Sequence, residues 1–147
     1  METTKHIEVV AAVIEVDGRL LCTQRGPNRR AYISGKWEFP GGKIEEGEAP
    51  DVALAREIRE ELQVDVRVGA HLLTVEHSYP DFALTMHAFR CELSDSPGAI
   101  RLSEHVSAEW LDPQSSAFAE LDWAAADVPI VDQLRRERAS AGGADPR

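Results

Sequence analysis

The first part of the chain has the apolar pattern of two buried strands joined by a tight turn. Residues 7–16 are rich in β-branched side chains and form a nearly continuous apolar run, which is typical of a mostly buried strand. The dipeptide Asp17-Gly18 follows and is a strong signal for a two-residue hairpin turn. Residues 19–25 resume the strand pattern, so the chain is predicted to begin with a β-hairpin.

A helical pattern occupies residues 50–62. Its apolar side chains recur every four positions and form one stripe, made of Leu54, Ile58 and Leu62. Pro50 suits the first position of a helix, where a missing N–H costs nothing, and Asp51 favours the positive end of the helix dipole. This segment is therefore predicted to be an amphipathic helix with one buried face.

The other segments have shorter patterns. In chain order they predict a polar loop at 26–36, a short strand at 37–39, a strand at 64–74 bent near Gly69, a turn at 79–81, a strand at 82–92, a loop at 94–99, a short strand at 109–111, a weak helix at 112–121 and a helix at 127–138. Strands around a central helix, with a helix at the C-terminal end, indicate the α/β (α+β) class with a mixed sheet packed between helices. Residues 1–138 are predicted to form a single domain, and residues 139–147 a disordered tail.

Composition narrows the class of ligand. The chain has 147 residues, of which 43% are hydrophobic and 29% charged, and it carries a formal net charge of −10, so it is expected to be soluble and globular. Binding a nucleic acid polymer normally requires a basic surface that neutralises phosphates, so this charge argues against that class of partner. A small phosphate compound is still compatible with the charge if metal ions bind with it.

The chain has no obvious sign of export or of membrane insertion. Its two cysteines, Cys22 and Cys91, fall in apolar strand-like runs and are expected to be reduced thiols in the core. No apolar stretch approaches eighteen residues, and the N-terminus lacks the pattern of a signal peptide. We therefore expect a cytoplasmic location and no membrane partner.

Candidate chemistry is concentrated in and just before the predicted helix. Residues 45–61 contain seven carboxylates: Glu45, Glu46, Glu48, Asp51, Glu57, Glu60 and Glu61. Glu57, Glu60 and Glu61 stand at i, i+3 and i+4, so their side chains converge on one side of the helix. Three like charges at this spacing repel each other, whereas a bound Mg²⁺ would use them, because it prefers carboxylates, water and phosphate oxygens as ligands.

The spacing of these residues is more specific than their charge. The chain reads Gly42, five residues, Glu48, seven residues, Arg56-Glu57-Ile58, one residue, Glu60-Glu61, one residue, Gln63-Val64. This arrangement resembles the signature box of the Nudix hydrolases, and the preceding run Trp37-Glu38-Phe39-Pro40-Gly41-Gly42-Lys43 is similar to that of the MutT-like branch. Gln63 departs from the pattern, because the family usually has glycine there. In a left-handed position Gln63 would cost about 1–2 kcal/mol, so we expect either that the helix ends differently or that this strain is tolerated.

The resemblance extends from about Ile7 to Leu134 and implies an α/β/α sandwich. It implies that Mg²⁺, or Mn²⁺ as a substitute, is bound by Glu57, Glu60 and Glu61 together with the backbone carbonyl of Gly41 or Gly42. Glu104 matches a loop glutamate that approaches the metal in MutT-like proteins. The catalytic base differs among family members, so it stays open here among Glu57, Glu60 and Glu104.

The resemblance also assigns residues around this centre. Glu48 and Arg56 are expected to hold the loop of the box against the helix. Arg25 and Lys43 are candidates for binding the phosphates, whereas Lys36 is expected to be solvated.

For the nucleobase the resemblance indicates Tyr79 and Asp127, although Asp127 is also a natural N-cap for the last helix. Many relatives that act on oxidised guanine have Asn at this position. An ionised Asp only accepts hydrogen bonds and would prefer the amino group of cytosine, whereas a protonated Asp would still suit an oxidised purine. Similarity to bacterial CTP pyrophosphohydrolases favours cytosine as well.

These observations predict a Mg²⁺-dependent enzyme that hydrolyses nucleoside or deoxynucleoside triphosphates to the monophosphate and pyrophosphate. CTP, dCTP or modified pyrimidine forms are the favoured substrates, and cleansing of the nucleotide pool is the expected role. The alternatives are an 8-oxo-dGTP diphosphatase, a hydrolase of nucleotide sugars or dinucleotides, and a nucleotide sensor without activity. The sensor is disfavoured because every glutamate of the box is present. The sequence leaves open the base, the sugar, the number of metal ions, and whether the chain is a monomer or a homodimer.

Overall fold

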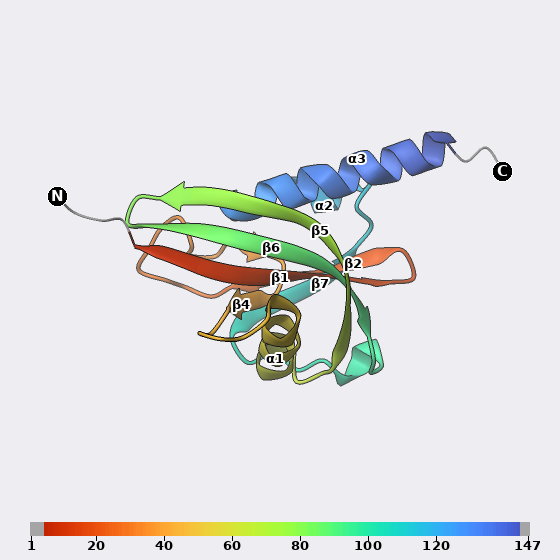
Figure 1. Ribbon diagram of the computed structural model, residues 1–147. Helices are drawn as coiled ribbons and strands as arrows, with labels where there is room; N and C mark the ends of the chain where they lie inside the picture. The colour runs from red at the N-terminus through yellow and green to blue at the C-terminus, as the bar shows by residue number, and fades with distance from the viewer. Residues whose placement is uncertain (1–4, 145–147) are drawn as a thin grey trace.

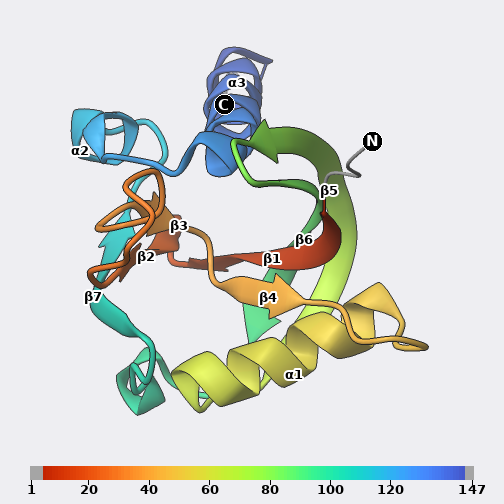
Figure 2. The same ribbon diagram turned by 90° about the vertical axis from the view of Figure 1, so that its left-hand side faces the viewer.

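Helices cover both faces of a mixed β-sheet. The structure is a computed structural model that describes the backbone of residues 5–144 and the side chains of residues 5–137. The first helix lies on one side of the strands, and the two C-terminal helices lie on the other side (Figures 1 and 2). This arrangement confirms the predicted α/β/α sandwich. None of the described helices is long and apolar enough to cross a membrane.

The strands and helices have the following bounds. The strands are β1 (His6–Val16), β2 (Arg19–Arg25), β3 (Trp37–Glu38), β4 (Gly41–Lys43), β5 (Val66–Tyr79), β6 (Phe82–Leu93) and β7 (His105–Leu111). The α-helices are α1 (Pro50–Leu62), α2 (Ser116–Glu120) and α3 (Val128–Ala144), and two short 3₁₀ helices are η1 (Pro97–Ala99) and η2 (Ala125–Asp127).

Strand β1 is the centre of the sheet. It pairs in parallel with β6 and antiparallel with β2 and β4, while β5 extends the sheet beyond β6, and β3 and β7 both pair with β2. The predicted hairpin between β1 and β2 is confirmed, and its turn residues Asp17 and Gly18 have φ values of 53° and 79°. Positive φ at both positions is the geometry that matches the twist of a two-residue hairpin.

The side chains of β1 alternate between two hydrophobic cores. Ala11 and Val13 face the core beneath α2 and α3, whereas Val10, Ala12 and Ile14 face the core beneath α1. Both sets are at most 2% exposed, because β1 is covered by helices on both faces. A strand covered in this way has a continuous apolar sequence, which is the pattern seen in residues 7–16.

The predicted bounds of α1 are confirmed. Leu54, Ile58 and Leu62 are fully buried, and Pro50 occupies the first turn. The residue after the helix, Gln63, has φ 59° and ψ 33°, and its N–H donates to the carbonyl of Arg59. The chain therefore keeps the left-handed C-cap that glycine usually provides, and tolerates a cost of about 1–2 kcal/mol.

Several other bounds differ from those predicted. Strand β4 was not predicted, because two glycines carry no apolar pattern. Strand β5 continues to Tyr79, with register shifts on both sides of His71 that agree with the predicted bend near Gly69. Strand β7 begins at His105 instead of residue 109, because residues 105–108 mix polar and apolar side chains without a clear strand pattern and are defined by pairing with β2.

The C-terminal part also differs from its predicted bounds. Helix α2 covers only five residues, and α3 continues six residues past residue 138. Residues 145–147 lie outside the described part of the chain, and disorder of the tail stays a prediction.

Candidate active site

A cavity of about 490 Å³ opens between the sheet, α1 and the loop that joins β2 to β3. This volume is in the range of small-molecule sites. Its lining has an acidic end with Glu57, Glu60, Glu61 and Glu104, and a second end with aromatic and apolar side chains, among them Phe39, Tyr79, Phe82 and Met86. Two surface depressions of similar volume lie beside β5, and no aromatic side chain lines either of them.

Glu61 is the most deeply buried member of the acidic end. The residue is 7% exposed, and its Oε1 atom is buried without a hydrogen-bond partner among the described residues. Burial raises the pKa of Glu61 to about 9, and the charges of Glu38, Glu57 and Glu104 raise it further, while the backbone N–H of Gly41 lowers it. Burial raises the pKa of Glu57 as well.

This arrangement fits a bound divalent cation. A buried carboxylate oxygen without a partner, surrounded by three further carboxylates, is unfavourable in the protein alone and is compensated by a positive ion. Within residues 5–137, no three carboxylate, imidazole or thiol groups converge closely enough to bind a metal ion in their present positions. The donor set therefore suits Mg²⁺, but the side chains have to adjust when it binds.

The raised pKa values predict how the stability of the metal-free protein depends on pH. Between the ordinary value of 4.5 and about 9, folded Glu61 retains a proton that the unfolded chain has released. The free energy of unfolding is therefore expected to fall as the pH rises through this interval. Glu57 and Asp127, whose pKa values are also raised, contribute with the same sign. Urea unfolding in EDTA at a series of pH values measures the effect, and stability that rises across the interval would contradict it.

Groups with lowered pKa values do not change the expected fall in stability between pH 4.5 and about 9. Hydrogen bonds from Arg56 lower the pKa of Glu48 to about 2, and a hydrogen bond with His87 lowers the pKa of Glu8. Their stabilising contributions are complete above 4.5 and are lost only as the pH falls below that value.

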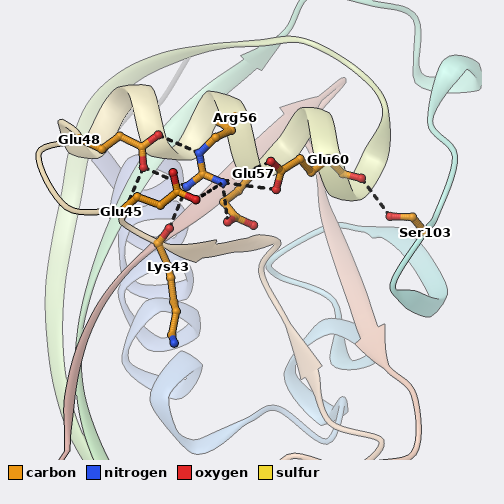
Figure 3. Close-up of polar contacts among 7 residues, drawn as sticks. All are labelled: Lys43, Glu45, Glu48, Arg56, Glu57, Glu60 and Ser103. Atoms are coloured by element: carbon orange, nitrogen blue, oxygen red, sulfur yellow. Dashed lines mark hydrogen bonds and ion pairs between the residues drawn. The ribbon is translucent and has the colours of Figure 1, made fainter.

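Arg56 connects the loop of the box to the helix (Figure 3). Its Nε and Nη2 atoms donate to the two carboxylate oxygens of Glu48 at 2.8 and 2.9 Å, and Nη2 also donates to the carbonyl of Lys43 at 3.0 Å. Its Nη1 atom donates to Glu57 at 3.0 Å and lies 3.3 Å from Glu60. Glu48 in turn accepts the backbone N–H of Glu45 at 3.0 Å. One guanidinium thus fixes the loop and also orients two of the candidate metal ligands.

The glycine pair brings the backbone of β4 close to its neighbours on two sides. A Cβ atom at Gly41 would lie 1.9 Å from the carbonyl oxygen of Val10 in β1. A Cβ atom at Gly42 would lie 2.3 Å from Oε1 of Glu57. Only glycine at both positions allows β4 to pair with β1 while the carboxylate of Glu57 packs against it. The backbone that carries the two candidate carbonyl ligands therefore lies beside the acidic cluster.

The basic candidates have different surroundings. Arg25 contacts both carboxylate oxygens of Glu38 at 3.2 Å through its Nε atom. Lys43 lines the cavity, and its ammonium group points away from the Arg56 network (Figure 3). Lys36 also lines the cavity and forms an ion pair with the exposed Asp122 at 3.0 Å, and its predicted solvation stays a prediction.

At the other end of the cavity, Asp127 is 5% exposed and its Oδ1 atom accepts the backbone N–H of Phe39 at 3.0 Å. The alternative interpretation as an N-cap is therefore wrong, because η2 runs directly into α3 and the carboxyl group binds another segment. Burial raises the pKa of Asp127 well above its ordinary value, and the charge of Glu38 adds to this shift. The group is thus favoured in its neutral form, which both donates and accepts hydrogen bonds.

Tyr79 forms part of the wall of the cavity. Its hydroxyl accepts the N–H of Ala126 at 3.1 Å, and its ring stacks on Tyr32 with 4.7 Å between the ring centroids. Tyr32 belongs to the loop before β3, and its hydroxyl donates to Asp81. A nucleobase therefore cannot lie between the two rings unless Tyr32 moves, although Tyr79 still lines the cavity.

No role was predicted for Glu38, which lines the cavity, or for His105, which contacts Glu38. Glu38 lines the cavity between its two ends, and His105 Nε2 lies 2.9 Å from Oε2 of Glu38. The His105 side chain is only 3% exposed, and its Nδ1 atom has no partner among the described residues. One feature of the sequence could have indicated a role for Glu38. It lies in the run just before the glycine pair, on a strand that pairs with the strand ending at Arg25.

Known proteins resemble this chain over most of its length. A family model described as NUDIX domain matches residues 4–134. The chain is 35% identical over 136 residues to the CTP pyrophosphohydrolase of Escherichia coli (strain K12), covering 92% of this chain and 96% of that protein. It is also 35% identical over 108 residues to the 8-oxo-dGTP diphosphatase of Proteus vulgaris, covering 69% and 95%.

Solved structures give the same result. The solution structure of the E. coli ORF135 protein has a TM-score of 0.76 and 36% identity, with coverage of 93% of this chain and 94% of that one. The crystal structure of the MutT protein from Methanosarcina mazei Go1 has a TM-score of 0.80 with coverage of 94% and 99%, but its identity of 23% supports the fold alone. The family model, the identities and the shared fold together show that the chain belongs to the Nudix hydrolases and to their MutT-like branch.

Proposed function

We propose that the chain is a Mg²⁺-dependent pyrophosphohydrolase of nucleoside and deoxynucleoside triphosphates. Water attacks the α- or β-phosphorus, the bond from that phosphorus to the oxygen bridging the two phosphates breaks, and the products are the nucleoside monophosphate and pyrophosphate. The observation that carries this proposal is a single cavity with a cluster of carboxylates at one end and a buried carboxyl group among aromatic side chains at the other. The proposed role is cleansing of the nucleotide pool.

The acidic end would hold the metal. Glu57, Glu60 and Glu61 from α1, Glu104 from the loop before β7, and the backbone carbonyl of Gly41 or Gly42 are the proposed ligands. When bound, Mg²⁺ neutralises charge on the phosphate oxygens and lowers the pKa of a bound water. Mn²⁺ is expected to substitute. The proposed catalytic base is one of Glu57, Glu60 and Glu104.

The remaining residues would orient the substrate. Lys43 and Arg25 line the cavity beside the carboxylates and are proposed to bind the phosphates. To bind a phosphate, Arg25 would have to share its guanidinium group between the phosphate and Glu38, or release Glu38. Asp127 and Tyr79 are proposed to bind the base, in a position next to the backbone N–H of Phe39.

CTP, dCTP or modified pyrimidine forms are the favoured substrates. Support comes from the similarity to the CTP pyrophosphohydrolase, which covers almost the whole of both chains. A second candidate, 8-oxo-dGTP, is favoured by the burial of Asp127, because burial favours the neutral carboxyl group. A neutral carboxyl group both donates and accepts hydrogen bonds, and a base with a carbonyl beside an N–H requires both.

Pyrophosphate release from a panel of triphosphates tests the proposal. The panel contains CTP, dCTP, a modified dCTP, dGTP and 8-oxo-dGTP, each with Mg²⁺ and with EDTA. Turnover that requires Mg²⁺ and is fastest with cytosine substrates supports the proposal, and fastest turnover of 8-oxo-dGTP supports the second candidate. Binding of nucleotides without turnover of any of them would instead indicate a sensor.

The substitution Asp127→Asn tests recognition of the base. Asn retains an acceptor for the N–H of Phe39 and presents a permanent donor to the ligand. We expect the ratio of kcat/KM for 8-oxo-dGTP to that for CTP to rise on the order of tenfold, the magnitude of one well-placed polar contact. Steady-state kinetics with both substrates measures this ratio. An unchanged ranking of substrates would remove Asp127 from base recognition and leave it a structural acceptor.

A further inference from the structure

The C-terminal end of α1 is capped by a segment that lies about forty residues further along the chain. The last four carbonyl groups of a helix have no partner within the helix. In α1, Gln63 N–H binds only the first of them, that of Arg59. The other three belong to residues 60–62, and they accept hydrogen bonds from the segment 101–103.

Ser103 makes most of these contacts. Its Oγ atom donates to the carbonyls of Glu60 and Glu61 at 3.0 and 3.1 Å, and its backbone N–H donates to Glu61 at 3.1 Å. The N–H of Arg101 donates to the carbonyl of Leu62 at 2.9 Å. Figure 3 shows Ser103 reaching the helix at Glu60, on the turn that carries the acidic side chains. The segment is thereby fixed to Glu60 and Glu61, two of the residues whose side chains form the acidic end.

The residue after Ser103 is Glu104, and the next residue is anchored as well. Glu104 lines the cavity, and its charge is one of those that raise the pKa values of Glu57 and Glu61. Its own carboxylate makes no hydrogen bond within the described part of the chain. On its other side, His105 is buried and lies 2.9 Å from Glu38. Glu104 is therefore placed by its two neighbours and not by a hydrogen bond of its own carboxylate to any described residue.

We propose that Ser103 is a positioning residue, and that its bonds to the end of α1 hold Glu104 at the acidic end of the cavity. This inference rests on the function proposed for Glu104 as a metal ligand or base. Without the hydroxyl, the segment would retain only the two backbone bonds made by Arg101 and Ser103, and the Glu60 carbonyl would lose its donor. Glu104 would then adopt a wider range of positions, and catalysis is sensitive to such displacements.

The substitutions Ser103→Ala and Ser103→Thr test the role of the hydroxyl. Ser103→Ala is expected to lower kcat by about threefold to tenfold, the effect of losing one hydrogen bond of ordinary strength. Mn²⁺ binding, titrated by electron paramagnetic resonance with a non-hydrolysable nucleotide present, is expected to weaken. Ser103→Thr keeps the hydroxyl and should restore both quantities. Ser96→Ala is the matched control, because Ser96 is exposed in the same connection and its hydroxyl has no hydrogen bond among the described residues.

The double variant with Glu104→Gln separates positioning from a purely structural role. If Ser103 acts through Glu104, Ser103→Ala causes no further loss of kcat once Glu104 has been replaced. An equal loss in both backgrounds, or no effect of Ser103→Ala on kcat and Mn²⁺ binding, would overturn the inference alone. A Glu104→Gln variant with wild-type kcat and Mn²⁺ affinity would instead refute the role proposed for Glu104, and the inference with it. Melting temperatures of the metal-free variants verify that each is folded.

Discussion

Replacing Glu61 with Gln is expected to lower kcat by about a hundredfold or more, because stabilisation of charge by the metal dominates this kind of catalysis. Gln retains the shape of the side chain but not the negative charge. Among the candidate ligands, Glu61 has a buried carboxylate oxygen with no hydrogen-bond partner in the described part of the chain, so no described protein group balances its charge there. Pyrophosphate release at saturating substrate and Mg²⁺, together with the Mn²⁺ titration, measures the loss.

Two comparisons make this result specific. Glu46→Gln is the matched control, because Glu46 is an exposed carboxylate of the same acidic stretch and does not line the cavity. It should retain the wild-type kcat. Metal-free Glu61→Gln should be at least as stable as the wild type at pH 8. At this pH the wild type must retain a proton on Glu61 in order to fold, because the pKa of this group is about 9 in the folded protein, whereas Gln needs no proton. Wild-type activity of Glu61→Gln would remove this residue from the site.

The substitution Gly41→Ala is expected to destabilise the fold by about 3 kcal/mol, the upper end of the usual cost of overpacking. The added Cβ atom would lie 1.9 Å from a backbone oxygen of Val10, and neither atom belongs to a flexible side chain. Val10 pairs with His87 of β6 and lies in the core, so β1 cannot move aside. Strand β4 would have to separate from β1. Denaturant unfolding of the metal-free protein measures this change.

Gly98→Ala is the control for this prediction. The nearest atom to an added Cβ atom at Gly98 is Oγ of Ser96 at 4.0 Å, and Gly98 does not have a positive φ. This variant should unfold within about 0.5 kcal/mol of the wild type, as surface substitutions usually do. If Gly41→Ala is as stable as Gly98→Ala, the close approach of β4 to β1 does not constrain residue 41.

Part of the fold was predictable because it depends on residues close together in the chain. The bounds of α1 follow from the spacing of its apolar side chains and from Pro50, and the first hairpin follows from Asp17-Gly18. The convergence of Glu57, Glu60 and Glu61 follows from the period of a helix. The family resemblance then supplied candidates outside this segment.

Other features have no local signal. Strand β4 is built from glycines, and only the close approach to β1 explains why they form a strand. The first half of β7 has a mixed sequence and forms a strand because it pairs with β2. The N-cap interpretation of Asp127 was wrong for the same reason, since its acceptor function is used by Phe39, a residue far away in the chain.

The sequence by itself determined the family, the class of fold and the group of carboxylates that are proposed to bind a metal, because the spacing along one helix specifies them. The tertiary structure decided how the charges of these groups are balanced. It buried one carboxylate oxygen of Glu61 without a hydrogen-bond partner among the described residues, joined Arg25 and His105 to Glu38, and fastened Ser103 to the end of α1. Burial and contacts between distant segments set pKa values and positions, and neither quantity is encoded in the pattern around any single residue.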